Sequence, residues 1–284
     1  MATLVCRSAF ISDVHLGLRD CKAGYLLDFL RRLRCEHLYL VGDIIDLEAL
    51  ARRPWWHSLH SAVLAELLAH AARGTRLTCI PGNHDAALRA LAGRSVAGIE
   101  IALDAVHVGG DGRRYRVSHG DEYDPEGQGR AWTRFGNFMQ NMVCGANRHF
   151  NALRGVFGLP YLPLSLALKA QSARAQAYIR AFEARVAAGT RAAGCDGAIC
   201  GHIHFGHVRT IDGVLYLNDG DWVEHCTALI ERADGAMELL HWSEQPTALG
   251  LASPERLLPS PAAVRAFAPL GRHAGKRPAL RPAA

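Results

Sequence analysis

The sequence lacks the long apolar runs and the closely spaced cysteine pairs that define several protein classes. Its longest run without a charged residue, 155–168, contains two prolines and is too short to span a bilayer. The eight cysteines form no C-x-x-C pair, so we expect free and mostly buried thiols in a reducing compartment. The first residues show no charged start followed by an apolar run and a cleavage site. We therefore expect a cytoplasmic protein.

The chain also lacks a general excess of one charge. Its net charge is +5, and 253–284 accounts for this with six basic residues against one acidic residue. That segment holds six of the 12 prolines, and we expect a flexible tail. Elsewhere, 125–191 carries nine Lys or Arg against two Glu, so the remainder is acidic by the same amount. This division disfavours nucleic-acid binding and favours an acidic metal pocket beside a surface for anionic ligands.

What is present is the composition of a globular protein, with 49% hydrophobic and 21% charged residues. Strand-like runs alternate with helix-like runs in the first part of the chain, which predicts a parallel sheet. Short β-like runs follow, several of them around Gly-rich or Asp-Gly turns. The predicted strands are 5–12, 37–41, 77–80, 98–102, 105–108, 114–118, 197–200, 208–211, 214–218, 222–231 and 237–242, and the predicted helices are 22–34 and 58–73. We expect an α/β (α+β) protein with two β layers flanked by helices.

A basic, aromatic segment interrupts this pattern. It contains eight of the 21 aromatic residues, and 165–188 is predicted to be one long helix. We interpret 125–191 as a helical cap inserted into a domain that spans 1–252. The alternative is that its aromatic side chains only pack the segment against the β core.

Five polar clusters each follow a strand-like run. They contain Asp13 and His15; Asp43 and Asp46; Asn83, His84 and Asp85; His119 and Asp121; and His202 and His204. Ligands of open α/β sheets lie beyond the carboxyl ends of the strands, so these clusters can converge on one crevice. One such cluster alone is usually a surface or turn feature, but five in this order predict a site. Carboxylate, imidazole and amide groups without cysteine suit Mn²⁺, Fe²⁺ or Zn²⁺.

The patterns D-x-H at 13–15, G-D-x-x-D at 42–46, G-N-H-D at 82–85, His119 and G-H-x-H at 201–204 resemble those of the calcineurin-like metallophosphoesterase superfamily. The resemblance implies a four-layer β-sandwich flanked by helices around two divalent ions, with Mn²⁺ expected first and Fe²⁺ or Zn²⁺ as alternatives. It assigns Asp13, His15 and His204 to one ion. It assigns Asn83, His119 and His202 to the other, with Asp43 as the bridging carboxylate.

The same resemblance implies attack on phosphorus by a hydroxide generated at the two ions. His84 would stabilise the transferring phosphoryl group or protonate the leaving oxygen. Asp85 and Asp121 would orient histidine ligands, or would only stabilise turns. Asp46 could cap the segment that follows it.

Within the superfamily, the motifs and the insertion after His119 are most similar to the UDP-2,3-diacylglucosamine pyrophosphohydrolases of lipid A synthesis. This implies cleavage of the pyrophosphate in UDP-2,3-diacylglucosamine, or a close lipid-linked analogue, to UMP and an acylated sugar phosphate. At the third cluster those enzymes have a motif that resembles G-N-R-D, whereas this chain has G-N-H-D, with His84 in the position of the arginine. The cap would receive the acyl chains, and its cations would meet the diphosphate or the inner membrane surface; the candidates are Arg130, Arg134, Arg148 and Arg154.

Two other functions remain open from the sequence. The same site could act on a soluble nucleotide or phosphodiester. The fold could also serve as a non-catalytic interaction scaffold, although the complete ligand set argues against this. The sequence leaves the oligomeric state open.

Overall fold

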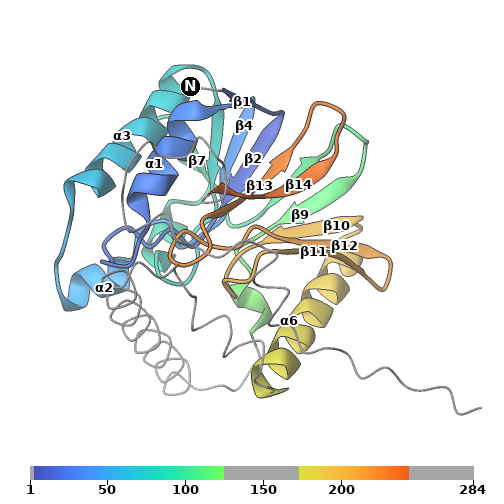
Figure 1. Cartoon of the computed structure of the whole chain (residues 1–284). Helices are drawn as coiled ribbons and strands as arrows, with labels where there is room; N and C mark the ends of the chain where they lie inside the picture. Colours follow the sequence, from blue (N-terminus) through green and yellow to red (C-terminus); the bar gives the residue numbers. More distant parts are fainter. Residues whose placement is uncertain (1–2, 125–172, 243–284) are drawn as a thin grey trace, which may run out of the picture.

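Two mixed β-sheets, flanked by helices, make up the part of the chain that the computed structural model describes, residues 3–124 and 173–242 (Figure 1). This confirms the predicted α/β class. The tail 253–284, the first part of the predicted cap and the four cap arginines (Arg130, Arg134, Arg148 and Arg154) lie outside the described residues.

The larger sheet contains the predicted parallel β-α-β-α-β unit. Its strands, in spatial order, are β14 (Met237–His241), β13 (Thr227–Glu231), β2 (Ser8–Ile11), β4 (His37–Leu40), β5 (Arg76–Cys79), β7 (Ile99–Ile101) and β6 (Ser95–Val96). Strands β2, β4, β5 and β7 are parallel, whereas β13 pairs with β2 antiparallel. The carboxyl ends of β2, β4 and β5 therefore meet at one edge.

The smaller sheet is built from two hairpins around a parallel centre. Its order is β11 (His207–Ile211), β12 (Val214–Asn218), β10 (Gly197–Cys200), β9 (Arg114–Val117) and β8 (Ala105–Val108). Strand β10 is parallel to both β9 and β12, so these three also end at a common edge. A further pair, β1 (Leu4–Val5) and β3 (Leu33–Arg34), is parallel.

Helices cover the outer side of each sheet. Helices α1 (Ala23–Arg32) and α3 (Ser58–Ala72) pack beside the larger sheet, α6 (Ala173–Ala192) packs on the smaller one, and α2 (Leu47–Arg52) is short. The described residues also contain two short 3₁₀ helices, Ala86–Leu91 and Asp121–Tyr123. No helix among the residues described, 3–124 and 173–242, is long and apolar enough to cross a membrane.

Strand alternation divides the core into layers. In β2, Ala9 and Ile11 pack with the residues of α1 and α3, while Phe10 between them faces the other sheet. Successive strand side chains point to opposite faces, so one strand contributes to two apolar layers. Five of the seven cysteines in the described part of the chain are buried.

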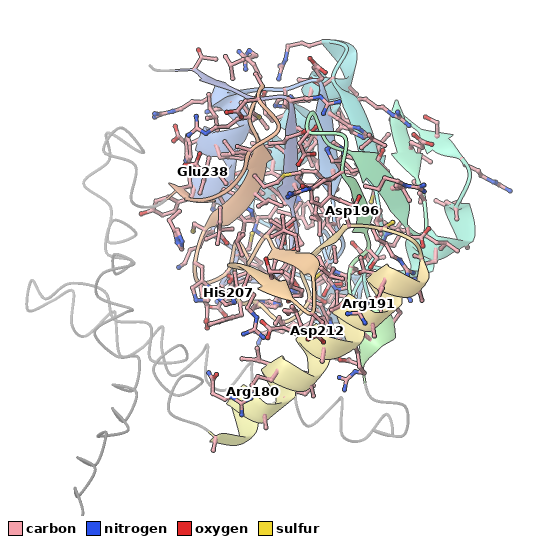
Figure 2. The ribbon with its side chains drawn as sticks, turned by 90° about the vertical axis from the view of Figure 1, so that its right-hand side faces the viewer. Arg180, Arg191, Asp196, His207, Asp212 and Glu238 are labelled. Carbon is pink, nitrogen blue, oxygen red and sulfur yellow. The ribbon has the colours of Figure 1, made fainter. Side chains whose placement is uncertain are left out.

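The helix predicted over 165–188 corresponds in its described part to α6. Phe182 and Val186 of α6 are buried against Ala198 and Tyr216 of the smaller sheet. Near the helix end, Arg191 donates to the backbone oxygen of Asp212 in the β11–β12 turn at 3.0 Å (Figure 2). The last part of the range predicted as a cap therefore packs on the sandwich as a flanking helix.

The strand predicted over 222–231 is wrong in its first half. Residues 222–225 form a turn, and the strand begins at Thr227. An Oδ1 atom of Asp221 accepts from the backbone amides of Val223 and Glu224, which holds the chain in the turn. An aspartate that accepts from the amides after it competes with strand pairing.

Candidate metal centre

The five polar clusters meet in space because each follows the carboxyl end of a strand. Asp13 and His15 follow β2, Asp43 follows β4, and Asn83 follows β5. From the smaller sheet, His119 follows β9, and His202 and His204 follow β10. Side chains from both sheets therefore reach one site, as the sequence predicts.

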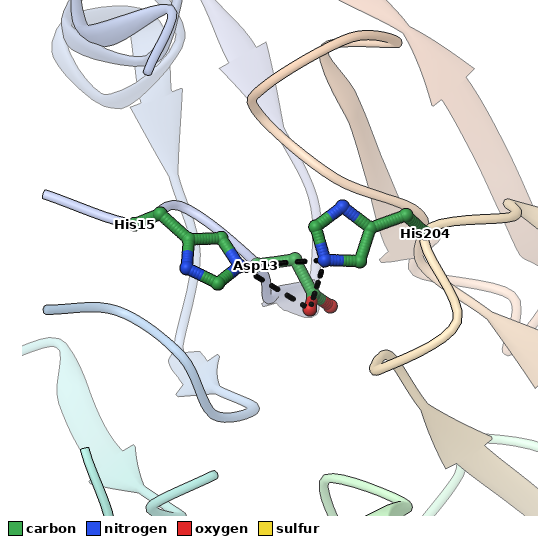
Figure 3. Close-up of side chains that lie close together, drawn as sticks. All are labelled: Asp13, His15 and His204. Atoms are coloured by element: carbon green, nitrogen blue, oxygen red, sulfur yellow. Dashed lines mark hydrogen bonds and ion pairs between the residues drawn. The ribbon is translucent and has the colours of Figure 1, made fainter. Parts of the chain in front are cut away.

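One group of ligand atoms comes from Asp13, His15 and His204 (Figure 3). His204 Nε2 lies 3.0 Å from Asp13 Oδ1 and 3.3 Å from His15 Nε2. His15 Nε2 lies 3.9 Å from the same Asp13 oxygen. The structure thus brings together the three residues predicted to bind the first ion.

A second group surrounds His119. Its Nε2 atom lies 3.4 Å from Asp43 Oδ2 and 3.2 Å from Asn83 Oδ1. Asp43 Oδ2 is also 3.8 Å from His15 Nε2, so this carboxylate stands between the two groups. This is the position expected of a bridging ligand.

His202 differs from the prediction in its contacts. Its Nε2 atom is 3.1 Å from Asp124 Oδ2, and its ring centroid is 5.1 Å from that of His119. Its backbone amide donates to Asp13 Oδ2 at 2.9 Å. His202 therefore borders the second group, with its Nε2 directed to a carboxylate that the sequence analysis did not single out.

Five of the seven residues predicted to bind metal share an uncommon backbone conformation. Asp13, His15, Asp43, His202 and His204 all have positive φ, between 49° and 70°. Non-glycine residues rarely adopt this region, and such strain persists only where surrounding contacts enforce it, often at functional sites.

Close packing also restricts one neighbouring residue. Gly42 has a φ of 88°, and a Cβ atom there would lie 2.2 Å from His119 Nδ1. Only glycine fits between the β4 loop and this histidine.

The hydrogen bonds of two histidines determine which ring nitrogens face the centre. His15 Nδ1 lies 3.1 Å from Asp46 Oδ2, and His119 Nδ1 lies 2.9 Å from the Val41 carbonyl oxygen. Both Nδ1 atoms therefore donate, and in the neutral rings each Nε2 carries a lone pair. These lone pairs face Asp13, Asp43 and Asn83 oxygens, so acceptors point at one another across the centre. Divalent cations fit this donor set of imidazole and carboxylate groups.

Without cations, protons would have to balance the carboxylates. Burial alone would lower the pKa of His15, but the hydrogen bond to Asp46 and the charges of Asp43 and Asp13 raise it to about 9. Burial likewise opposes protonation of His119, while Asp43 raises the pKa of His119 well above its ordinary value. The buried carboxylates of the centre therefore favour positive charge beside them.

Asp46 has two functions that use different oxygens. Its Oδ2 atom lies 3.1 Å from His15 Nδ1 and 3.0 Å from His84 Nδ1. Its Oδ1 atom accepts from the Ala49 amide at 2.7 Å and so caps α2. Of these two functions, the sequence predicts only the cap. The contact with two histidines, whose ring centroids are 4.8 Å apart, could not be inferred from the local spacing.

Asp85 accepts hydrogen bonds from backbone amides, whereas the prediction was that it orients a histidine ligand. It is fully buried, and its oxygens accept from the amides of Gly82 at 2.6 Å and Ile44 at 2.9 Å. Burial and the charge of Asp43 raise the pKa of Asp85. This residue ties the β5 loop to the β4 loop that carries Asp43. Asp121, the other candidate, pairs with Arg89 through both carboxylate oxygens at 2.8 Å.

Two further acidic residues, Asp124 and Asp219, belong to the surroundings of the site. Asp219 is fully buried and contacts Ser12, the neighbour of Asp13. The signal for it was present, because Asp219 follows strand β12 as the five clusters follow theirs. No comparable pattern marks Asp124.

Comparison with solved structures gives several matches of low identity. They include YfcE, a phosphoesterase from E. coli (14% identity, 82% of this chain and 98% of that chain, TM-score 0.41). They also include vacuolar protein sorting 29 from Cryptosporidium parvum (13%, 82% and 97%, TM-score 0.37) and an archaeal phosphodiesterase (12%, 82% and 98%, TM-score 0.39).

Comparison with family models gives one match that covers most of the chain. No curated protein matches significantly. The model of the calcineurin-like phosphoesterases matches residues 6–206, a range that contains all five polar clusters. The chain therefore belongs to the calcineurin-like phosphoesterase family.

Proposed function

We propose that this protein hydrolyses the pyrophosphate bond of UDP-2,3-diacylglucosamine, or of a close lipid-linked analogue, to UMP and an acylated sugar phosphate. The observation that carries the proposal is the His/Asp centre, in which Asp43 stands between two groups of ligand atoms. Family membership and this centre make the chain a metallophosphoesterase with a His/Asp metal-binding site. The choice of substrate is supported by the sequence motifs.

The residues that would hold two divalent ions are Asp13, His15 and His204 on one side, and His119, Asn83 and His202 on the other, with Asp43 between. We propose Mn²⁺, with Fe²⁺ or Zn²⁺ as alternatives. Two such ions supply activation of water and neutralisation of charge on the phosphate oxygens. Asp46 fixes the His15 ring, and Val41 fixes the His119 ring, so the protein determines which nitrogens face the centre.

His84 is the residue placed to move a proton. Its Nδ1 atom is held 3.0 Å from Asp46 Oδ2, and 14% of its side chain is exposed beside the centre. With Nδ1 beside Asp46, Nε2 is the ring nitrogen that would face substrate. When water adds to phosphorus and the bridging P–O bond breaks, His84 Nε2 gives a proton to the departing oxygen or bonds a phosphoryl oxygen.

The substrate proposal depends on 125–172, outside the described residues. The arginines Arg130, Arg134, Arg148 and Arg154 would bind the diphosphate or contact an anionic membrane surface, and the aromatic residues would receive acyl chains. The cap is proposed to end before α6, because Phe182 and Val186 of that helix belong to the core.

A substrate panel tests the proposal. The purified, Mn²⁺-loaded protein is incubated with UDP-2,3-diacylglucosamine, UDP-N-acetylglucosamine and bis(p-nitrophenyl) phosphate, and the products are identified by mass. We expect UMP and the acylated sugar phosphate at the highest kcat/KM. Efficient cleavage of the soluble diester with none of the diacylated substrate would favour the soluble-phosphodiester alternative. Full metal loading without any hydrolysis would favour the scaffold alternative.

Single substitutions of the cap arginines test the placement of the lipid-linked substrate. We expect Arg130→Ala and Arg134→Ala to lower kcat/KM about 10- to 100-fold for UDP-2,3-diacylglucosamine, because one charge-assisted bond to phosphate is worth about 1.5–3 kcal/mol. They should leave bis(p-nitrophenyl) phosphate cleavage unchanged. Arg113→Ala, on the β8–β9 hairpin, is the matched control. Equal losses on both substrates would contradict a role in substrate recognition.

A further inference from the structure

A buried hydrogen-bonded chain links the metal ligand Asp13 to a second carboxyl group. Ser12 Oγ lies 2.5 Å from Asp13 Oδ2 and 2.6 Å from Asp219 Oδ1. All three residues are buried, with at most 1% of their surface exposed. Ser12 directly follows β2 of the larger sheet, and Asp219 directly follows β12 of the smaller sheet. The link therefore joins the two sheets beside the metal centre.

The surrounding backbone packs closely against this link and is itself hydrogen-bonded. The Asp219 amide donates to the Cys200 carbonyl oxygen at 3.0 Å, and Asn218 Nδ2 donates to that of Gly201 at 2.7 Å. A Cβ atom on Gly201 would lie 2.1 Å from Ser12 Oγ and 2.3 Å from Asp13 Oδ2. The loops after β2, β10 and β12 thus pack directly on one another.

The two oxygens of Asp13 consequently have different roles. Oδ2 is occupied by Ser12 and by the His202 amide, which donates at 2.9 Å. Oδ1 faces His204 Nε2 at 3.0 Å and His15 Nε2 at 3.9 Å. Whatever holds Oδ2 therefore decides how Oδ1 is presented to a cation.

The number of available protons determines which groups donate in the link between Asp13, Ser12 and Asp219. A serine hydroxyl donates one proton, yet Ser12 Oγ makes a short contact with a carboxyl oxygen on each side. If Ser12 donates to Asp13, the contact with Asp219 needs a donor on the Asp219 side. Burial raises the pKa of Asp219 well above its ordinary value, which agrees with a protonated carboxyl group there.

We propose that Asp219 is a positioning residue for the metal centre: it holds the Ser12 hydroxyl toward Asp13 and thereby fixes the Asp13 oxygen that faces the cation. The inference rests on the metal-binding part of the proposed function and is independent of the substrate. Such partners of metal ligands are typically worth 10- to 100-fold in metal affinity.

The test is Mn²⁺ binding to the EDTA-treated full chain, measured by calorimetry. Asp219→Ala and Ser12→Ala should each weaken binding about 10- to 100-fold. Because both act through one link, the double variant should bind no more weakly than the weaker single variant. Asp219→Asn should stay within about threefold of the wild type, because its amide can donate to Ser12 and conserve the partner.

A matched control separates positioning from loss of stability. Glu231 is another fully buried carboxylate, and it bonds Arg7, His107 and the Gly110 amide. Glu231→Gln should lower the melting temperature and leave Mn²⁺ affinity unchanged.

Three results would overturn the inference: wild-type affinity in Asp219→Ala or in Ser12→Ala, multiplicative losses in the double variant, or an equal loss in Asp219→Asn and Asp219→Ala. Ser12→Ala keeps the test decisive if substitutions of Asp219 do not fold. A wild-type chain that binds no Mn²⁺ would instead refute the metal site in the proposed function.

Discussion

Asp46 combines two functions on separate oxygens, so two substitutions can measure them independently. Oδ2 holds the Nδ1 atoms of His15 and His84, at 3.1 and 3.0 Å, while Oδ1 caps α2 through the Ala49 amide at 2.7 Å. In Asp46→Ser, a hydroxyl can still cap the helix but is too short to reach either histidine. In Asp46→Ala, both functions are lost.

The expected magnitudes follow from these contacts. The loss of the partner that fixes a ligand histidine should weaken Mn²⁺ binding about 10- to 100-fold, equally in Asp46→Ser and Asp46→Ala. The loss of the cap should cost about 1 kcal/mol of unfolding free energy, and only in Asp46→Ala. Both variants lose the histidine contacts, so the difference in stability between them isolates the cap.

Two assays on EDTA-treated protein check this separation. Calorimetric titration with Mn²⁺ gives the affinity, and guanidinium unfolding gives the free energy of unfolding. Wild-type Mn²⁺ affinity in Asp46→Ser would refute the orienting role. Equal stability of the two variants would refute the cap.

Three further outcomes are expected. Asp43→Ala should reduce bound metal from two ions per chain to one or none, because Asp43 stands between both groups of ligand atoms. Plasma mass spectrometry measures the bound metal, and two retained ions would exclude the bridging role. His84→Ala should keep its metal content and lower kcat about 100-fold, within the usual range for loss of a general acid, whereas loss of metal would assign His84 to the ligands. Burial alone would raise the pKa of Glu231. Hydrogen bonds from the Gly110 amide and Ser8, followed by the charge of His107 and a hydrogen bond from Arg7, lower this pKa below its ordinary value of 4.5. The unfolded chain therefore takes up a proton first as the pH falls, so this stabilisation is present above about pH 4.5 and is lost below it. The melting temperature of the wild type should accordingly fall more steeply than that of Glu231→Gln between about pH 5 and pH 3, and parallel curves would contradict this.

The core of the site could be predicted because it depends on strand order. Apolar runs mark β2, β4, β5, β9 and β10, and a polar cluster follows each of them. Parallel strands end at one edge, so the convergence of Asp13, Asp43 and His119 follows from the topology. The distances confirm that these residues meet.

The partners of the ligands could not be predicted, because they depend on contacts between distant loops. Asp46 and Asp85 both resemble turn residues in the sequence. Asp46 nevertheless bonds His15 and lies 3.0 Å from His84 Nδ1, and Asp85 bonds backbone amides. Asp219 follows β12 as the five clusters follow their strands, but its contact with Ser12 joins two different sheets and does not follow from the sequence. Local spacing does not carry this information.

The predicted boundaries of helices and strands are wrong where a tertiary contact overrides the local sequence pattern. The helix predicted over 22–34 ends at Arg32, because Leu33 and Arg34 pair with β1. The apolar start of 222–231 forms a turn, because Asp221 binds the amides that follow it.

Anomalous X-ray diffraction from crystals grown with Mn²⁺ tests the two-metal centre, because it locates the ions themselves. We expect two peaks, one bounded by Asp13, His15 and His204 and the other beside His119 and Asn83, with the Asp43 carboxylate between them. A single peak, or none at this centre while Mn²⁺ binds elsewhere, would contradict this expectation.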